Sequence, residues 1–377
     1  MQRSSLPFFK KRFIQLVALI IVAFAPAFTT GSQPDAYITL QNQRLTITPK
    51  EFYIARIDDH RADKAGLGSM LAPPKAGKPA ESLEVDLQGG TAAAMKTFVD
   101  NSFTPNKSLR ALVIKLKTFN VAETALANGA AAGKISYSIS FGYERDDDFI
   151  LLDNYTASST YQRPAGPPQY IEALLRSIIS SSLLYINKWM DTQAGVNMKL
   201  ARGVSIKFTD YKEVPEGDTI YYNVNRPLKW ADFIAKPPSS RYAAEVFASL
   251  GYNEEVKLVD GIIKIRLDLK VYVPKSASWV RYDVTDNHSL NHEQRHFDIV
   301  RLAAERFKQA ILKEKLTTYN YDGPINVAYL DALRDIYAVQ KQYDAETGHG
   351  TNTYQQQRWA ARIDKELQIL GIKPPKS

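Results

Sequence analysis

The feature that most constrains the fold is a strict alternation of side chains between residues 262 and 274. Isoleucine, leucine and valine occupy every second position from Ile263 to Val273, and charged residues occupy most of the positions between them. A period of two predicts a long strand with one buried and one solvated face. From His288 onward the apolar positions recur at helical spacing instead, which predicts helices at about 288–315, 325–345 and 352–370. An antiparallel sheet followed by helices indicates an α+β fold.

The first half of the chain shows a similar mixture. Residues 135–141 alternate strictly, and the segment DDDFILLDNYTAS is expected to return as their hairpin partner. Helices are expected at 91–103 and 169–190. We therefore predict an α+β accessory or binding domain over residues 33–192 and a second domain over residues 204–377.

Composition excludes several classes of protein. The chain contains no cysteine, so disulfides, thiolate metal sites, cysteine catalysis and lipidation at cysteine are excluded. The formal net charge of +8 comes from lysines and arginines scattered along the sequence. Because no basic tract is interleaved with aromatic residues, we expect no nucleic-acid partner.

The first 30 residues have the pattern of a signal peptide. Arg3 and the cluster Lys10–Arg12 precede the apolar run FIQLVALIIVAF, and small residues follow it. This run is shorter than the roughly 20 residues that span a bilayer, which favours a cleaved signal, cut near Thr29–Gly31, over an uncleaved anchor. We expect a periplasmic or secreted bacterial protein with no stable membrane span after cleavage.

The segment SLNHEQRHFDIV holds two of the chain's five histidines, His292 and His296, with Glu293 directly after the first. On a helix, both imidazoles can reach one ion, and the glutamate can deprotonate a water bound to it. Chance produces this pattern in about 1 of 400 chains of such composition. The helical row continues through Val300 and Phe307, so the histidines face the core. We predict a zinc site with Glu293 as catalytic general base; two hydrogen-bonded core histidines are the competing interpretation.

A catalytic zinc site needs a third protein ligand. Ile299 and Leu302 occupy the positions where the extended motif HExxHxxGxxH has glycine and histidine, so the ligand must come from another segment. YDAETGHGTN offers Asp344, Glu346 and His349. We predict His349, which lies between two glycines after a helix end, as the third metal ligand, and Glu346 as the next candidate.

Several other polar residues have two interpretations. Asp298 is either an acceptor for a histidine N–H or an exposed helix charge, and His288 either extends the histidine row or is solvated. Glu305 is expected to point outward, and His60 to lie in a surface loop. Possible donors to an oxyanion are Tyr343, Tyr354 and Arg358, with no ground in the sequence for choosing among them.

Four segments carry a resemblance to a known family: LKWADF, SASWV, NHEQRHFDI and YDAETGHG. They resemble the bacterial domain-of-unknown-function 922 family, described as predicted secreted zinc-dependent proteases, over roughly residues 208–370. The resemblance implies a zincin-like domain in which His292 and His296 bind zinc, Glu293 is the general base and His349 is the third ligand. The first half is not covered and looks distantly like modules of envelope lipoproteins and transport accessory proteins.

The sequence therefore predicts an exported zinc-dependent metallohydrolase, foremost a peptidase acting on a peptide or protein substrate. Two alternatives stay open. One is a non-catalytic envelope binding or assembly protein with a structural metal site, and the other is zinc hydrolysis of a non-peptide amide of the cell wall. We also expect that strand 263–273 either offers an edge to an extended peptide or is a fully paired central strand.

Overall fold

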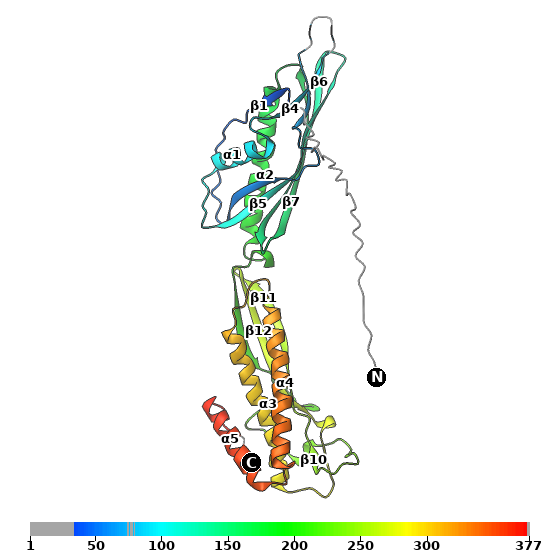
Figure 1. Ribbon diagram of the computed structural model, residues 1–377, viewed down its shortest axis with the longest axis vertical. Helices are drawn as coiled ribbons and strands as arrows, with labels where there is room; N and C mark the ends of the chain where they lie inside the picture. Colours follow the sequence, from blue (N-terminus) through cyan, green and yellow to red (C-terminus); the bar gives the residue numbers. More distant parts are fainter. Residues whose placement is uncertain (1–33, 74, 76–77, 79, 375–377) are drawn as a thin grey trace, which may run out of the picture.

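The computed structural model describes residues 34–73, 75, 78 and 80–374 (Figure 1). The predicted signal peptide, residues 1–30, lies outside the described residues. Within the described part the chain combines three sheets with five α-helices, which confirms the predicted α+β class. No helix in these ranges is both long and apolar enough to cross a membrane.

A seven-stranded sheet and two α-helices share one hydrophobic core that ends at Leu200. The strand order is β1-β4-β3-β5-β6-β7, and β2 pairs with β5. The elements are β1 (Ala36–Ile38), β2 (Phe52–Asp59), β3 (Gly68–Leu71), β4 (Ser82–Leu87), α1 (Thr91–Ser102), β5 (Arg110–Ala125), β6 (Ala130–Arg145), β7 (Asp148–Pro164), η1 (Pro168–Ile171), α2 (Glu172–Gln193) and η2 (Met198–Leu200).

The hairpin of β6 and β7 is the one expected from the alternating pattern. The apolar positions between Ile135 and Phe141 are buried, and the hydroxyl of Tyr137 lies 3.3 Å from Ser182 Oγ on α2. Asp146 and Asp147 turn the chain with φ values of 50° and 67°. Two consecutive positive φ values match the right-handed twist of the strands on either side, and aspartate tolerates them.

The second sheet carries the helices predicted after residue 288. Its long strand β12 is central, paired with β11 on one side and with β8 and β9 on the other. The remaining elements of this half are β8 (Gly203–Asp210), β9 (Thr219–Tyr221), η3 (Trp230–Asp232), β10 (Ala244–Glu245), β11 (Ser249–Val259), β12 (Ile262–Pro274), η4 (Lys275–Ala277), β13 (Trp279–Val280), α3 (Asn287–Lys313), α4 (Asp322–Thr347) and α5 (Thr353–Ile369).

The expectation of an antiparallel sheet needs correction. β12 and β8 are parallel, with Ile262 opposite Gly203, so the sheet is not purely antiparallel. The alternation of side chains reports which face is buried and carries no information about strand direction. Of the two alternatives for this strand, the structure shows the fully paired central one: β12 is paired along both edges and offers no edge to a peptide.

Helices α3 and α4 lie side by side against the second sheet, and α5 contacts both of them (Figure 1). Phe297, Val300 and Phe307 pack into the core of the sheet, whereas Ile299 and Leu302 pack into a smaller core with side chains of α4 and α5. All residues from 292 to 304 are buried. A helix enclosed on all sides must satisfy its polar side chains inside the fold, because an unpaired buried polar group is costly.

Candidate metal centre

The histidine pair lies in the second and third turns of α3. Asp286 caps this helix, and its carboxylate accepts a hydrogen bond of 2.8 Å from the backbone N–H of Ser289. Aspartate is a favoured cap because it satisfies an N–H of the first turn that has no helical partner. The helix therefore begins before His292, and the spacing of four residues brings His292 and His296 to one face, towards α4.

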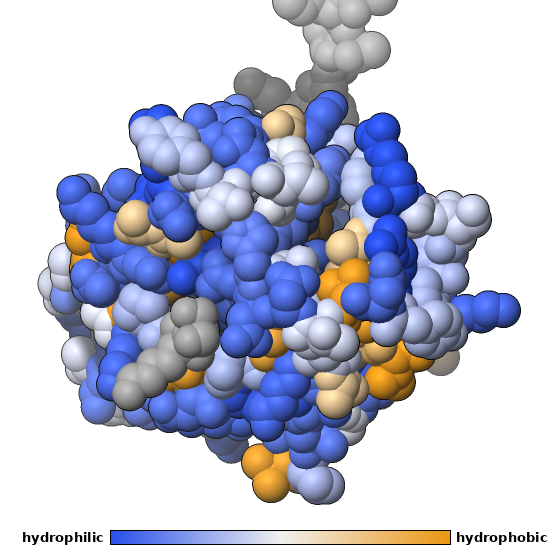
Figure 2. All heavy atoms as spheres, turned by 90° about the horizontal axis from the view of Figure 1, so that it is seen from below, coloured by the Kyte–Doolittle hydropathy of each residue, from blue (hydrophilic) through white to orange (hydrophobic). Residues whose placement is uncertain are grey.

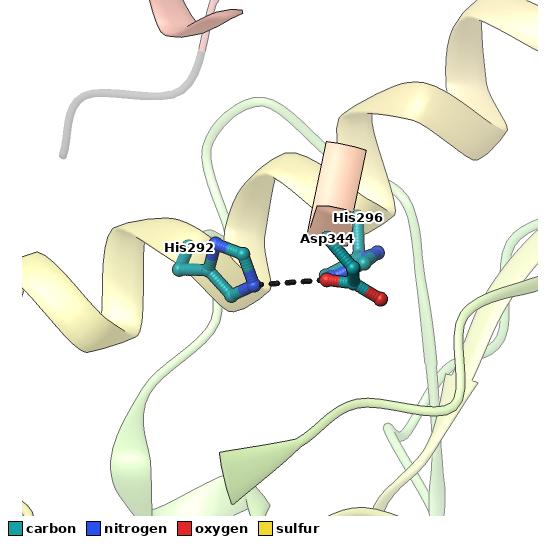
Figure 3. Close-up of side chains that lie close together, drawn as sticks. All are labelled: His292, His296 and Asp344. Carbon is teal, nitrogen blue, oxygen red and sulfur yellow. Dashed lines mark hydrogen bonds and ion pairs between the residues drawn. The ribbon is translucent and has the colours of Figure 1, made fainter. Parts of the chain in front are cut away.

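Both imidazoles converge on one carboxylate oxygen of α4 (Figure 3). Asp344 Oδ1 lies 3.2 Å from His292 Nε2 and 3.0 Å from His296 Nε2. The Nδ1 atom of His292 is buried and has no hydrogen-bond partner among the described residues. These three residues form the one group of potential metal ligands found in the described part of the chain.

The donors fit a divalent cation of the first transition row. Ligand atoms around a tetrahedral ion bound at about 2.0–2.1 Å lie about 3.3 Å apart, and the two imidazole–carboxylate distances are close to that spacing. Without a cation, the single oxygen satisfies both ring nitrogens only if each carries a proton. Two imidazoles and one carboxylate are the ligands of one type of catalytic zinc site, which keeps a fourth position open.

The pKa values show how strongly these groups interact. Burial lowers the pKa of His292, and the hydrogen bond with Asp344 offsets this only in part. Burial also lowers the pKa of His296, but the hydrogen bond and charge of Asp344 outweigh it and the net pKa is raised. For Asp344, burial raises the pKa, and the two histidines lower it well below the usual range. A metal ion binds an imidazole only in its neutral form, so protonation of these histidines would oppose metal binding.

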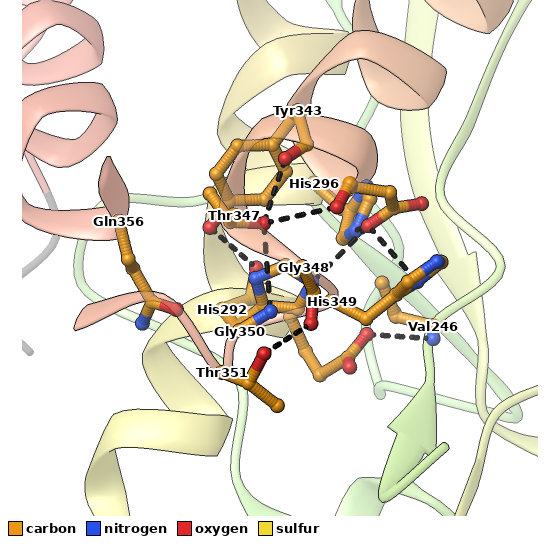
Figure 4. Close-up of polar contacts among 12 residues, drawn as sticks. Val246, His292, His296, Tyr343, Thr347, Gly348, His349, Gly350, Thr351 and Gln356 are labelled. Atoms are coloured by element: carbon orange, nitrogen blue, oxygen red, sulfur yellow. Dashed lines mark hydrogen bonds and ion pairs between the residues drawn. The ribbon is translucent and has the colours of Figure 1, made fainter. Parts of the chain in front are cut away.

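Glu293 lies beside the three donors and is buried. One of its oxygens accepts a hydrogen bond of 2.9 Å from the backbone N–H of Val246 (Figure 4). Burial raises the pKa of Glu293 to about 7, although the charge of His296 and the Val246 hydrogen bond oppose that rise. A carboxylate with a pKa near neutrality can both accept and return a proton.

Strand β10 presents a backbone edge towards Glu293. β10 pairs antiparallel with β13, and the backbone N–H of Arg281 donates a hydrogen bond of 2.9 Å to the carbonyl oxygen of Ala243. Because successive residues of a strand direct their backbone groups to opposite sides, those of Ala244 and Val246 point away from β13. The hydrogen bond from Val246 to Glu293 lies on this second side.

A cavity of about 180 Å³ joins the donors to the segment 242–246. Its carboxylates are Glu245, Glu293 and Asp344, and no lysine or arginine belongs to the described lining. The full lining consists of Tyr242, Ala243, Ala244, Glu245, Val246, Ser289, His292, Glu293, His296, Gln340, Asp344 and His349. The cavity is therefore suited to neutral or cationic groups and poorly suited to phosphate esters.

His349, the ligand predicted from the sequence, lies at the mouth of this cavity. Its Nδ1 is 3.7 Å from Asp344 Oδ1, and its ring centroid is 4.0 Å from that of Tyr242. Gly348, His349 and Gly350 have φ values of 56°, 52° and 84°, and this left-handed turn ends α4. The turn places His349 next to the three donors, where it can act as a further ligand or contact a substrate.

A hydrogen bond from α3 holds this turn in place. His288 Nε2 lies 2.7 Å from the carbonyl oxygen of Gly350. Gln356 Nε2 donates a hydrogen bond of 2.9 Å to the carbonyl oxygen of His288. A Cβ at Gly350 would lie 3.3 Å from Cγ of His292, so glycine permits the close approach of the turn to the histidine. His288 is thus exposed in the first turn of α3, as one of the two interpretations expected, and its ring also holds the turn after α4.

Two other candidates lie outside the cluster. Glu346, the second choice for the third ligand, accepts hydrogen bonds from Gln342 and from Trp359. Because α4 continues to Thr347, Glu346 is two residues beyond Asp344 and points to nearly the opposite side of the helix. Asp298 is fully buried but accepts hydrogen bonds from other donors than the histidines, namely Gln294, Arg295 and Tyr222.

Sequence reasoning gave too little weight to Asp344 and did not single out Tyr242, Glu245 or Val246. Asp344 was one of three candidate ligands in YDAETGHG, and only the exact end of α4 distinguishes it from Glu346. The strand β10 is two residues long and has no alternating pattern that could have revealed it. Tyr343 stacks on His292 at 4.7 Å and is buried, while Tyr354 and Arg358 do not belong to the cavity lining.

Comparison with known proteins bears on this half of the chain. Residues 261–350 match the family described as "Bacterial protein of unknown function (DUF922)". The resemblance inferred from the sequence is thereby confirmed for the C-terminal part. The matched range begins with β12 and ends with the turn after α4, so it contains His292, Glu293, His296, Asp344 and His349.

Two solved structures show a limited likeness. The crystal structure of protein XCC0632 from Xanthomonas campestris, assigned to DUF330, is 12% identical with a TM-score of 0.25, and the match covers 43% of this chain and 98% of that one. A minor lipoprotein from Acinetobacter baumannii is 14% identical with a TM-score of 0.18, covering 26% and 75%. None of the curated proteins matches the chain. These scores establish neither a shared fold nor a function.

Proposed function

We propose that this protein is an exported zinc-dependent metallohydrolase with a zincin-like C-terminal half, and that it cleaves peptide bonds. The observation that carries the proposal is the convergence of two imidazole nitrogens and one carboxylate oxygen beside the buried carboxylate of Glu293. A structural zinc site has four protein ligands and is closed. Here the three donors line a cavity, which favours a catalytic site over a structural one.

His292, His296 and Asp344 would hold the metal in this proposal, with His349 as the competing third ligand. A zinc ion, when bound, supplies a Lewis acid that polarises a carbonyl group and lowers the pKa of a water molecule to about 7. The stacking of Tyr343 on His292 and the hydrogen bonds of Asp344 fix the orientation of the donors. Fixed donors favour catalysis because no reorganisation is needed during the reaction.

Glu293 is the general base of the proposed reaction. Its carboxylate takes a proton from the attacking water and returns it to the leaving amine. The pKa of about 7 reflects a buried carboxylate, and a cation beside it would shift the pKa downward and keep Glu293 ionised at neutral pH. Tyr242, the one tyrosine in the described lining of the cavity, could donate to a developing oxyanion.

The edge of β10 provides a mode of binding for an extended peptide. Backbone groups of Ala244 and Val246 face Glu293, so a peptide paired with this edge would pass in front of the metal donors. Main-chain pairing of this kind gives affinity without demanding a particular sequence. The carboxylate-rich lining supports amides over phosphate esters as the hydrolysed class.

Replacement of Glu293 by Gln tests the proposal. We expect the purified variant to retain stoichiometric zinc, while the rate of hydrolysis of a mixed peptide library falls by about 10²–10⁴-fold. Glu314→Gln, the same chemical change just after α3, should leave both properties unchanged. Full activity in Glu293→Gln, or wild-type protein that binds no zinc, would refute the proposal. Hydrolysis of cell-wall amides but not of peptides would retain the mechanism and replace the substrate.

A further inference from the structure

We propose that Glu245 is a specificity-determining residue that selects peptides with lysine or arginine next to the bond to be cut. This inference rests on the proposed peptidase function and names the substrate class for the same cavity. Three observations carry it: the free charge of Glu245, its fixed orientation and its place on β10.

Glu245 is the one carboxylate of the cavity that has no other role. Asp344 is engaged by two histidines, and Glu293 is the proposed base. Glu245 is exposed at the cavity, and no ion pair within the described residues includes it. An unneutralised carboxylate beside a binding site attracts cationic groups and disfavours anionic ones.

The carboxylate of Glu245 is held in one orientation. Trp279, its register partner on β13, donates a hydrogen bond of 3.0 Å from Nε1 to Oε2. Trp279 is itself buried, so its indole is a rigid support. This contact occupies one oxygen of Glu245 and leaves the other available to a ligand.

The position of Glu245 on the strand determines which part of a peptide it would meet. A peptide residue placed directly opposite Glu245, along the edge of β10 that faces Glu293, would direct its side chain to the same face, at a Cβ–Cβ distance of about 4.5–5.5 Å. The neighbouring residue Val246 contacts Glu293, the proposed base. The peptide side chain that Glu245 would contact therefore lies beside the bond that Glu293 would help to break.

The surrounding surface suits recognition by charge. Figure 2 views the end of the molecule that carries β10 and shows a mainly hydrophilic surface with small, separate hydrophobic groups. Exposed apolar side chains in this half, such as Phe247 and Tyr282, are not part of the cavity lining. Hydrophobic selection of a large apolar side chain would need a continuous apolar pocket.

The test compares peptides that differ at one position beside the scissile bond, with Lys, Arg, Gln, Leu or Glu there. For the zinc-loaded full chain we expect kcat/KM to be about three- to fivefold higher for Lys and Arg than for Gln, and lowest for Glu. Glu245→Gln keeps an acceptor for Trp279 but removes the charge, and should abolish this preference. Glu245→Lys should reverse it towards Glu peptides. Glu84→Gln, an identical change in the first sheet, is the matched control.

Peptide binding provides a second readout that does not require turnover. In the Glu293→Gln background, Kd values for the same peptides should show the same order and lose it when Glu245 is also replaced. Cleavage without a preference for cations, or a preference that survives in Glu245→Gln, would overturn the inference while leaving the peptidase function intact. Absence of cleavage together with charge-dependent binding would instead contradict the peptidase function alone.

Discussion

At the scale of single residues, the site depends on one oxygen atom. Asp344 Oδ1 is shared by two imidazoles, so it is the point from which a cation would be held. His349 is adjacent but farther from this oxygen, at 3.7 Å, and its side chain is 39% exposed. An exposed ring can move onto a metal at little cost, whereas the buried donors are already placed.

Substitution can show whether Asp344 or His349 is the third metal ligand. We expect Asp344→Asn to weaken zinc binding by more than the roughly 10–100-fold that loss of an outer-shell partner causes, and His349→Ala by about tenfold or less. Competition with a chelator of known affinity measures the zinc affinity of both variants. Glu346→Gln, which changes a carboxylate on the opposite side of α4, serves as control. A larger loss in His349→Ala than in Asp344→Asn would make His349 the third ligand.

The turn that carries His349 depends on glycine at position 350. Its φ of 84° is unfavourable for other residues, and a Cβ would meet Cγ of His292 and Oε1 of Gln356, each at 3.3 Å. We expect Gly350→Ala to lower the free energy of unfolding by about 1–2 kcal/mol and to weaken zinc binding.

Gly371→Ala separates the effect of backbone strain from the effect of contact with the metal site. Gly371 also has a positive φ, 71°, but no atom lies within 4 Å of the position of a Cβ. This variant should lose stability through backbone strain alone, as measured by chemical denaturation, and should bind zinc normally. Equal zinc affinities in the two variants would show that the turn does not support the site.

At the scale of elements, α3 is the structural centre of the C-terminal half. Its apolar side chains belong to two hydrophobic cores, and several of its buried polar side chains are hydrogen-bonded in the same interior. Asp298 alone accepts hydrogen bonds from three side chains. Removing one partner of such a buried network leaves the others unsatisfied, so α3 has little freedom to shift. The two histidine donors therefore lie on a rigid helix.

The ion pair between β8 and α3 makes a pH-dependent contribution to stability. Burial raises the pKa of Asp210, but the hydrogen bond of 2.8 Å from Arg301 and the charge of Lys308 outweigh it, and the net pKa is lowered. A lowered native pKa stabilises the fold above the unfolded value of about 3.9, and this stabilisation is lost as the pH falls through the native pKa.

Replacement of Asp210 by Asn isolates that contribution. Since the carboxylate of Asp210 is 44% exposed, we expect the substitution to lower the free energy of unfolding by only about 0.5–1 kcal/mol at pH 7. The difference from wild type should shrink as the pH falls below about 4. Urea denaturation at a series of pH values measures it. A difference that stays constant down to pH 3 would show that lost packing, and not charge, causes the effect.

At the scale of the whole molecule, the two halves have separate hydrophobic cores. Leu200 belongs to the first core and Ala201 to the second. Contacts between the halves include Arg145, whose guanidinium lies 4.4 Å from the ring centroid of Tyr319. Figure 1 shows the two large sheets at opposite ends of the long axis. Because the two hydrophobic cores are separate, we expect each half to unfold with limited effect on the other.

Zinc should therefore stabilise only the half that contains the site. At a free zinc concentration of about 100 Kd, binding adds about 2.7 kcal/mol to the free energy of unfolding, which raises Tm by about 5–10 °C for a unit of this size. Calorimetry should show two transitions, of which zinc shifts one and a chelator reverses the shift. Movement of both transitions together would show that the halves unfold as one unit.

The sequence by itself determined the features that depend on local spacing. The alternation from Ile263 to Val273 predicted β12, helical periodicity predicted α3, α4 and α5, and the spacing of His292 and His296 placed both on one helix face. These patterns are local because the repeat of a strand or a helix fixes the direction of neighbouring side chains.

Only the tertiary structure decided which distant residues meet. The packing of α4 on α3 brought Asp344, and not Glu346, to the histidines, because the rotation of one helix against the other selects one side of α4. Pairing of β10 with β13 created the edge and the orientation of Glu245, neither of which is visible in a strand of two residues. Such contacts depend on the free energy of burying whole surfaces together, which no short window of sequence contains.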